Sequence, residues 1–453
     1  MTTTKTVVQD LAALATAMRA TPLATGTAEA AERVLLDWLG VTLGGGRAAP
    51  AVALIQGFGR LAGPSRVVGG GNAPPPIAAL INGTAAHTLE LDDIYAPGLY
   101  HPGAPTIAAG LAVADQTGAS GERLLRAIVT GYEVGCRVAA DLGPEHYRNW
   151  HTTGTAGSVG AAAAAAEILG LDEAAFAHAL AISATMASGL QQTFRGDAMG
   201  KPLHAGNAAQ AGVVAAALAR GGVTGAPDVL EGAAGLAAAT GAATSDWANC
   251  RATLDRGLAV ESITVKPYPC CGHTFAVIDA VLLLRERGLT AEQVDRLEVG
   301  TYAAALDVAG IARPATVPER RFSIPYLAAV ALTDGAVTEA SVERDRTDER
   351  FPALVGAVAL EVEQPFEERF PGRRGARVTA VTRDGRRLRA EVPDRSGSPQ
   401  NPLPRDRMEQ KFLAAAAAVL GPDGRDLLER VRGLRDGGPV SGLILGSPVP
   451  DTA

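Results

Sequence analysis

The sequence predicts a mainly α protein in which a smaller α+β domain is inserted into a large all-helical domain. The chain of 453 residues is too long for one ordinary hydrophobic core. Hydrophobic residues make up 47% of it but aromatic residues only 4%, so Ala, Val, Leu and Ile must build the core. Alanine favours helices because it loses no side-chain entropy there. Helical spacing dominates up to about residue 255, gives way to strand-like patterns and returns near residue 407.

Apolar residues at helical spacing predict a series of helices in the first part of the chain. The first covers residues 30–43, and the three glycines that follow are a suitable stop. Asp172 is a typical N-cap, and Phe176 and Leu180 follow it at the spacing of a buried stripe. Further helices are expected at residues 105–117, 122–142, 154–169, 172–188, 205–220 and 226–232.

Strand patterns begin near residue 257 and predict the inserted domain. Asp384-Gly385 separates the last two expected strands and is a strong hairpin signal. Strands are expected at residues 259–265, 297–302, 359–362, 377–382 and 387–392, and helices at 271–287, 323–332, 407–420 and 426–434. A linker rich in Pro, Ser and Asn covers residues 393–404. We therefore expect residues 1–262 together with 405–453 to form the helical domain and residues 263–404 the α+β domain.

Composition excludes several classes of partner. The net charge of −7 argues against non-specific nucleic-acid binding, which needs a basic face, but leaves room for a local cationic pocket that takes an anionic substrate. The four cysteines show neither a disulfide framework nor paired zinc spacing, which fits a reduced, cytoplasmic setting. Residues 1–10 lack the apolar region of a signal peptide, and no apolar run is long enough to predict a membrane span.

The densest polar segment is residues 266–275, which holds Lys266, Cys270, Cys271 and His273 directly before an apolar, helix-like run. Its two prolines keep the backbone extended, so the polar groups are predicted to lie on a stiff loop that leads into a helix. The two cysteines and His273 lack metal or nucleophile partners in the sequence.

His101 follows an acidic run at residues 90–95, which could hold or polarise its imidazole. Metal binding by Asp92, Asp93 and His101 is an alternative, but their spacing matches no recognised ligand set, and we expect no metal. The acidic run could also be an ordinary exposed loop before a helix.

His151 and Lys201 each precede an expected helix, and His204 follows Lys201 closely. The positive end of a helix dipole suits a carboxylate, so helix N-termini that converge on one cavity would form an electropositive pocket. A plain helix cap and a surface lysine are the simpler interpretations. No phosphate loop, dinucleotide fingerprint, serine elbow or zincin motif is present, and no cofactor is expected.

Several of these segments together resemble the MmgE/PrpD family, which includes 2-methylcitrate dehydratase, cis-aconitate decarboxylase and iminodisuccinate epimerase. The matching pieces run in order along nearly the whole chain. They are Asp92-Asp93 with His101-Pro102-Gly103, the His151 segment, residues 200–209, residues 266–275, residues 322–326 and residues 401–403. The resemblance implies a large helical domain, a smaller α+β lid domain, a homodimer and cofactor-independent chemistry on a small-molecule carboxylate.

The resemblance also implies roles for individual residues. The family's catalytic positions fall on His101, His151, Lys201 and Tyr326. Substrate-binding positions are expected at Glu90, where relatives carry Asp, and at Lys266, His204, His273 and Phe275.

Phe275 departs from the family pattern, because relatives commonly carry a catalytic histidine there. His273 is not an obvious replacement, since many relatives with the usual histidine carry one at this place too. The first hypothesis is a lyase, either a dehydratase or a decarboxylase, resembling 2-methylcitrate dehydratase. An isomerase or epimerase of specialised metabolism that acts on a bulkier substrate is the alternative, and an inactive binding protein is a third.

Overall fold

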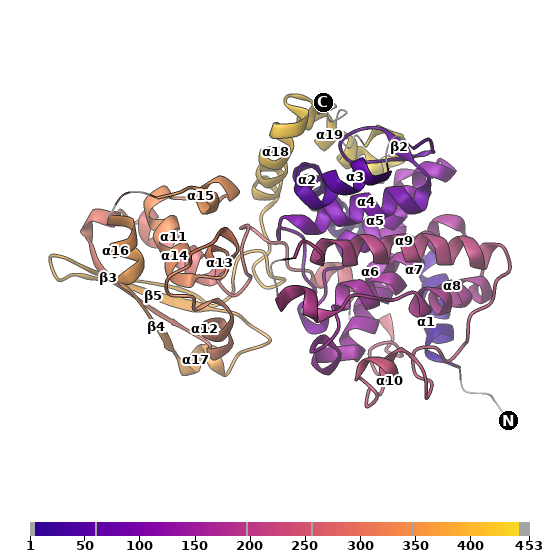
Figure 1. The fold of residues 1–453 in the computed structure, drawn as a ribbon, viewed down its shortest axis with the longest axis horizontal. Coiled ribbons are helices and arrows are strands. Elements are labelled where there is room, and N and C mark those ends of the chain that lie inside the picture. Colours follow the sequence, from indigo (N-terminus) through magenta and orange to yellow (C-terminus); the bar gives the residue numbers. More distant parts are fainter. Residues whose placement is uncertain are drawn as a thin grey trace. The chain divides into compact units, whose positions relative to one another are not determined.

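The computed structural model describes residues 5–58, 61–195, 198–254, 257–346, 348 and 350–443. The chain divides into two compact units, Met1–Val265 with Pro404–Ala453, and Lys266–Leu403 (Figure 1). Helices predominate, so the predicted mainly α class is confirmed. The expected role of the inserted domain as a lid stays a prediction.

The first unit is built almost entirely from helices. They are α1 (Val7–Arg19), α2 (Thr25–Gly45), α3 (Ala49–Phe58), α4 (Pro75–Thr88), α5 (Gly103–Thr117), α6 (Gly121–Tyr147), α7 (Thr152–Leu169), α8 (Glu173–Thr185), α9 (Lys201–Arg220), α10 (Leu236–Thr240), α18 (Arg405–Leu420) and α19 (Asp423–Arg432). A short antiparallel pair, β1 (Ser65–Arg66) and β2 (Asn72–Ala73), accompanies them. The C-terminal helices return to this unit, where α18 packs on α2.

Helix α7 is the centre of the first unit and packs against α5, α6, α8 and α9. Its alanine-rich sequence is buried from Thr152 to Ile168, which small side chains permit because they let neighbouring helices approach closely. Helices α9 and α4 approach each other closely: a Cβ atom on Gly206 would stand 2.3 Å from the Leu80 carbonyl oxygen. Only glycine fits there, and this contact brings the first turns of α9 beside the end of α4.

The second unit has a four-stranded sheet in the order β4 (Val358–Val362), β3 (Val294–Thr301), β5 (Ala376–Thr382), β6 (Arg387–Val392). β3 and β4 are parallel and the other pairs antiparallel. The β5–β6 hairpin turns at Asp384-Gly385 as predicted, with Gly385 at a φ of 85°. The helices are α11 (Phe275–Glu286), α12 (Ala303–Ala309), α13 (Val317–Arg320), α14 (Ile324–Asp334), α15 (Glu339–Glu343), α16 (Arg350–Gly356) and α17 (Gln364–Glu367).

Two expected elements are wrong. Residues 259–265 do not form a strand, because the polar pair Glu261-Ser262 interrupts the apolar run and a 3₁₀ turn (Ala259–Ser262) takes its place. Only Thr264 pairs, with Ile94. Residues 226–232 form turns rather than a helix, since the Asp228 carbonyl accepts a single hydrogen bond from Gly232 and the helix α10 begins only at Leu236.

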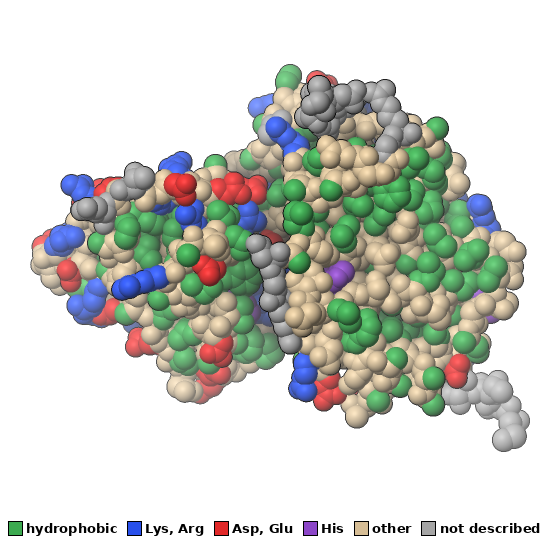
Figure 2. Space-filling model, viewed as in Figure 1, with side chains coloured by type: hydrophobic (Ala, Val, Ile, Leu, Met, Phe, Trp, Pro, Cys, Tyr) green, Lys and Arg blue, Asp and Glu red, His purple; other side chains and the backbone are tan. Residues whose placement is uncertain are grey.

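Surface composition differs between the two units. On the face drawn in Figure 2, charged side chains gather on the second unit and are sparse over the first. Within the described part of the chain, no single helix is long and apolar enough to cross a membrane, although α2 and α3 together, bent by 75°, could do so by length and composition alone.

Candidate active site

Three helices of the first unit begin beside polar side chains that the sequence singled out. α5 starts two residues after His101, His151 is the N-cap of α7, and α9 starts at Lys201. The His101 backbone N–H donates to Thr153 Oγ1 at 3.2 Å in the first turn of α7, and the His151 imidazole contacts His204 in the first turn of α9. The helix starts therefore meet, and their dipoles favour negative charge at this place.

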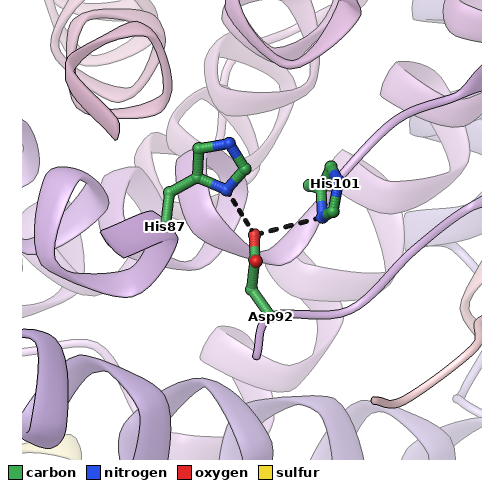
Figure 3. Close-up of side chains that lie close together, drawn as sticks. All are labelled: His87, Asp92 and His101. Atoms are coloured by element: carbon green, nitrogen blue, oxygen red, sulfur yellow. Dashed lines mark hydrogen bonds and ion pairs between the residues drawn. The ribbon is translucent and has the colours of Figure 1, made fainter. Parts of the chain in front are cut away.

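A buried carboxylate lies between two imidazoles at this site (Figure 3). The Nδ1 atom of His87, in the last turn of α4, is 2.6 Å from Asp92 Oδ2. His101 Nδ1 lies 3.3 Å from the same oxygen, the separation of an ion pair rather than of a well-aligned hydrogen bond. Burial alone would raise the pKa of Asp92, but His87 and His101 hold it well below its usual value. Asp92 is therefore ionised at neutral pH.

Four imidazoles form a continuous array. The His87 ring stands edge-on to His101, with ring centroids 4.9 Å apart, and stacks on His151 at 5.3 Å. The His151 and His204 rings follow at 5.3 Å. Phe194 packs its ring against His151 at 4.9 Å and supplies an apolar wall.

His151 and His204 share one hydrogen, because their Nδ1 atoms are 3.2 Å apart and one must donate while the other accepts. Burial, with the nearby charges of His87 and Lys201, lowers the pKa of His151 well below its usual value. Burial likewise lowers the pKa of His204 to about 4. At neutral pH the pair is uncharged, and the tautomer of His151 is tied to that of His204.

Lys201 and Glu90 form an ion pair at the start of α9, with each side chain 24% exposed. The Lys201 ammonium also lies 5.5 Å from the centroid of the Phe194 ring. Glu90 has a φ of 57°, a conformation that non-glycine residues rarely adopt outside functional or tightly held turns. The structure thus brings together Glu90, His101, His151, Lys201 and His204.

The other expected site residues belong to the second unit. Lys266 is buried, with 3% exposure, and Phe275 is fully buried with its ring 5.7 Å from that of Tyr268. The Tyr326 hydroxyl donates to the Val342 carbonyl at 3.3 Å. These residues have defined surroundings within their own unit, and their expected roles stay predictions.

His273 also lies in the second unit, in a turn before α11 rather than in the helix that was expected to begin at residue 271. Its Nδ1 is 2.9 Å from the Tyr302 hydroxyl. Burial, with Arg374 and Arg395 nearby, lowers its pKa to about 3. It is a neutral, hydrogen-bonded imidazole in this unit.

Sequence reasoning missed His87 and misjudged the acidic run. His87 is one of the seven histidines of the chain, and it has no evident partner in the sequence. Asp92, five residues later, was the only local signal. The interpretation of that run as an exposed loop is wrong, because Asp92 and Asp93 are 2% and 3% exposed. Asp93 accepts hydrogen bonds from Tyr132 and from the Gly103 backbone, and burial raises its pKa to about 7, so it anchors the start of α5.

His87, Asp92 and His101 offer three ligand atoms within 4.8 Å of one another, which is a possible set for a metal ion. However, His87 Nδ1 and Asp92 Oδ2 are separated by a hydrogen-bond distance of 2.6 Å. Two ligands at about 2.0–2.1 Å from a tetrahedral zinc stand roughly 3.3 Å apart. The arrangement fits a hydrogen-bonded carboxylate, and a cation would have to push the two groups apart.

His146 contacts Thr155 near the start of α7 and makes the stability of the first unit depend on pH. Its two ring nitrogens contact Thr240 and Thr155 at 2.8 and 2.7 Å, and burial lowers its pKa from 6.5 to about 4. Below pH 6.5 His146 binds a proton in the unfolded chain but not in the folded chain. Its contribution to the free energy of unfolding is therefore fully present above pH 6.5 and is lost as the pH falls toward 4. At pH 5 this amounts to about 2 kcal/mol for one such residue.

Between pH 7 and pH 5 we therefore expect His146→Gln to lose about 2 kcal/mol less of its free energy of unfolding than the wild-type protein does. Urea unfolding followed by tryptophan fluorescence measures it, because Trp38, Trp150 and Trp247 all belong to the first unit. His178→Gln is the control, since His178 is half-buried and accepts a long 3.3 Å bond from the Gly225 N–H. Equal pH dependence in the wild-type protein and both variants would contradict the assignment.

Comparison with known proteins agrees with this architecture. The model of the MmgE/PrpD N-terminal domain matches residues 9–246, and that of the MmgE/PrpD C-terminal domain matches residues 268–433. Cis-aconitate decarboxylase of Homo sapiens is 30% identical over 410 residues, which is 84% of this chain and 81% of that protein. The Mus musculus enzyme is 28% identical over 405 residues, covering 84% and 80%. Cis-aconitate decarboxylase of Aspergillus terreus is 26% identical over 385 residues, covering 79% and 78%. The chain belongs to the MmgE/PrpD family, as the resemblance of its motifs implied.

Proposed function

We propose that this protein is a cofactor-independent lyase that acts on a small carboxylate by proton transfer at carbon, with decarboxylation or dehydration as the net reaction. The observation that carries this proposal is the uncharged His151–His204 pair, which lies beside the cationic Lys201 at the meeting point of three helix starts. The cis-aconitate decarboxylases among its relatives support the same class of reaction.

The site suits an anionic substrate. Lys201 supplies a positive charge, and the positive ends of the α5, α7 and α9 helix dipoles favour a negative group beside it. The overall charge of −7 does not oppose this, because the field in a pocket depends on the nearest groups. A substrate carboxylate here would also reverse the effect that Lys201 has on His151 and make the imidazole more basic.

Decarboxylation at this site requires one proton. The bond between the carboxyl carbon and its neighbour breaks, carbon dioxide leaves, and the electron pair that remains on carbon takes up a proton from an imidazolium, which the bound substrate favours and which returns to the neutral imidazole. Dehydration instead removes a proton from carbon and gives one to the departing hydroxyl, so it uses one base and one acid. His151 and His101 are suited to these two roles, and Lys201 can stabilise the negative charge that develops on the substrate in either reaction.

The proposal is tested by incubating the protein in D₂O with a panel of di- and tricarboxylates that includes cis-aconitate. Release of carbon dioxide with one deuterium on carbon supports decarboxylation, and loss of one water supports dehydration. Deuterium uptake without a change of composition would contradict the lyase and favour the isomerase or epimerase. Binding without exchange or turnover across the panel would favour the inactive binding protein.

Phe275 is the observation that favours the isomerase as second candidate, because relatives commonly carry an imidazole there and a proton-return reaction needs fewer acids. If the missing imidazole limits lyase chemistry, Phe275→His should raise the lyase rate at least about tenfold. The substitution also buries a polar ring beside Arg395, whose guanidinium lies 5.6 Å from the Phe275 ring centroid, and should cost about 1–3 kcal/mol of stability.

Phe275→Leu is the matched control, since it removes the aromatic ring without adding an imidazole. Rates on the best acid of the panel and thermal midpoints are measured for both variants. A gain shared by both variants would show that pocket shape, rather than the imidazole, limits the rate. No gain in either would remove Phe275 as the reason for altered chemistry.

A further inference from the structure

We propose that His87 is a positioning residue, which holds the Asp92 carboxylate so that His101 keeps its hydrogen on Nδ1 and exchanges protons only through Nε2. The inference rests on the proposed function for its catalytic consequence. It assigns a role to a residue that no family motif singled out, and it explains why a fully buried imidazole stands between two candidate catalytic ones.

The Asp92 carboxylate is the centre of this arrangement. It is 2% exposed, and its Oδ2 atom makes both imidazole contacts. Its Oδ1 atom is buried and has no hydrogen-bond partner among the described residues. A buried carboxylate is stable only when hydrogen-bond donors or positive charges lie next to it. For Asp92 these groups are the imidazoles of His87 and His101.

The hydrogen between His87 and Asp92 can be placed from the donor inventory. An ionised carboxylate oxygen only accepts, so His87 Nδ1 carries the hydrogen. The other ring nitrogen, Nε2, is buried without a hydrogen-bond partner in the described part of the chain. The contact of His87 with the described polar groups of the site therefore runs through Nδ1, which donates to Asp92.

His87 matters because the second contact of Asp92 is loose. His101 Nδ1 stands 3.3 Å away, a separation that could tighten when substrate binds. Without His87, the carboxylate would have only this partner, and burial would favour its protonation. A protonated Asp92 would donate its hydrogen to His101 Nδ1 instead of accepting one. His101 would then carry its own hydrogen on Nε2, and Nε2 could no longer take up a proton.

The test compares His87→Asn with His87→Phe in the full chain. The asparagine amide can donate from nearly the place of Nδ1, whereas phenylalanine fills the ring volume and donates nothing. We expect His87→Phe to lower kcat by roughly ten- to a hundredfold with KM nearly unchanged, as for outer residues that orient a catalytic group, and His87→Asn to recover most of the loss. A purely packing role predicts the reverse order, because phenylalanine leaves no cavity.

Tautomers provide a readout that needs no turnover. In ¹⁵N-histidine-labelled protein, the wild type and His87→Asn should show His101 with hydrogen on Nδ1, and His87→Phe should shift it toward Nε2. Phenylalanine equal to or better than asparagine in kcat, or a His101 tautomer that is unchanged in His87→Phe, would overturn the proposal. Failure of the proposed function is distinguishable, since it appears as no turnover by the wild type while the NMR result still stands.

Discussion

His151→Ala should lower the turnover of the best carboxylate substrate by about 10²- to 10⁴-fold, the range expected for the loss of a positioned proton-transfer group. The imidazole lies in the middle of the array and shares a hydrogen with His204. Burial is the main cause of its lowered pKa, and nearby positive charge adds to it; a bound anion would offset that charge and raise the pKa of His151.

The substitution should leave the fold intact, which makes the activity measurement interpretable. His151 caps α7 through its backbone position only, since its side chain makes no capping hydrogen bond, and its N–H donates to the Gly189 carbonyl at 2.8 Å in any variant. His178→Ala is the control for removal of a half-buried histidine. A His151→Ala protein that folds normally and turns over substrate at the wild-type rate would exclude the role.

His204 allows a second check of the same mechanism. His204→Phe should lower turnover by roughly ten- to a hundredfold, because it removes the partner that sets the His151 tautomer. In the double variant the two losses should not add, since His204 acts through His151. Additive losses would mean that His204 acts on the substrate by itself.

Local signals in the sequence predicted the fold well. Asp172 caps α8 by accepting the Ala175 N–H at 2.8 Å, and Asp384-Gly385 turns the β5–β6 hairpin. These features depend on neighbours in the chain, so a single sequence displays them. The strand predicted at residues 259–265 is wrong because a strand needs a partner strand, and among the described residues only Ile94 forms a bridge with this segment.

The candidate site shows the same division. The sequence singled out His151 and Lys201 because a helix start is a local signal, whereas the meeting of three helix starts follows from packing. His87 was missed because its role depends on the turn after α4, which folds Asp92 back onto it, and on the stacking of His151 from a distant helix. A lone histidine near the end of an apolar helix has no signal that separates it from a core residue.

Lys201→Ala should lower kcat/KM by about 10²- to 10³-fold, because it removes the cation that would face both the bound carboxylate and the charge that develops in the transition state. Lys201 is the first residue of α9, and its ammonium lies over the Phe194 ring and pairs with Glu90, so it can face a substrate bound at the helix starts. Its quarter exposure leaves it able to exchange Glu90 for a substrate oxygen, which a fully buried pair could not do without a large desolvation penalty.

Stability should change little in this variant, because a partly exposed lysine–glutamate pair typically contributes about 0–1 kcal/mol. Lys5→Ala is the matched control, since Lys5 pairs with Glu173 in the same unit, with side chains 55% and 50% exposed, and takes no part in the site. Steady-state kinetics and thermal midpoints are measured for both.

Lys201→Arg separates charge from shape: arginine keeps the cation but changes its size and donor geometry. Partial activity in Lys201→Arg with a near-total loss in Lys201→Ala is the pattern expected for a charge stabiliser. Equal activity of Lys201→Ala and Lys5→Ala would mean that the helix starts alone hold the substrate.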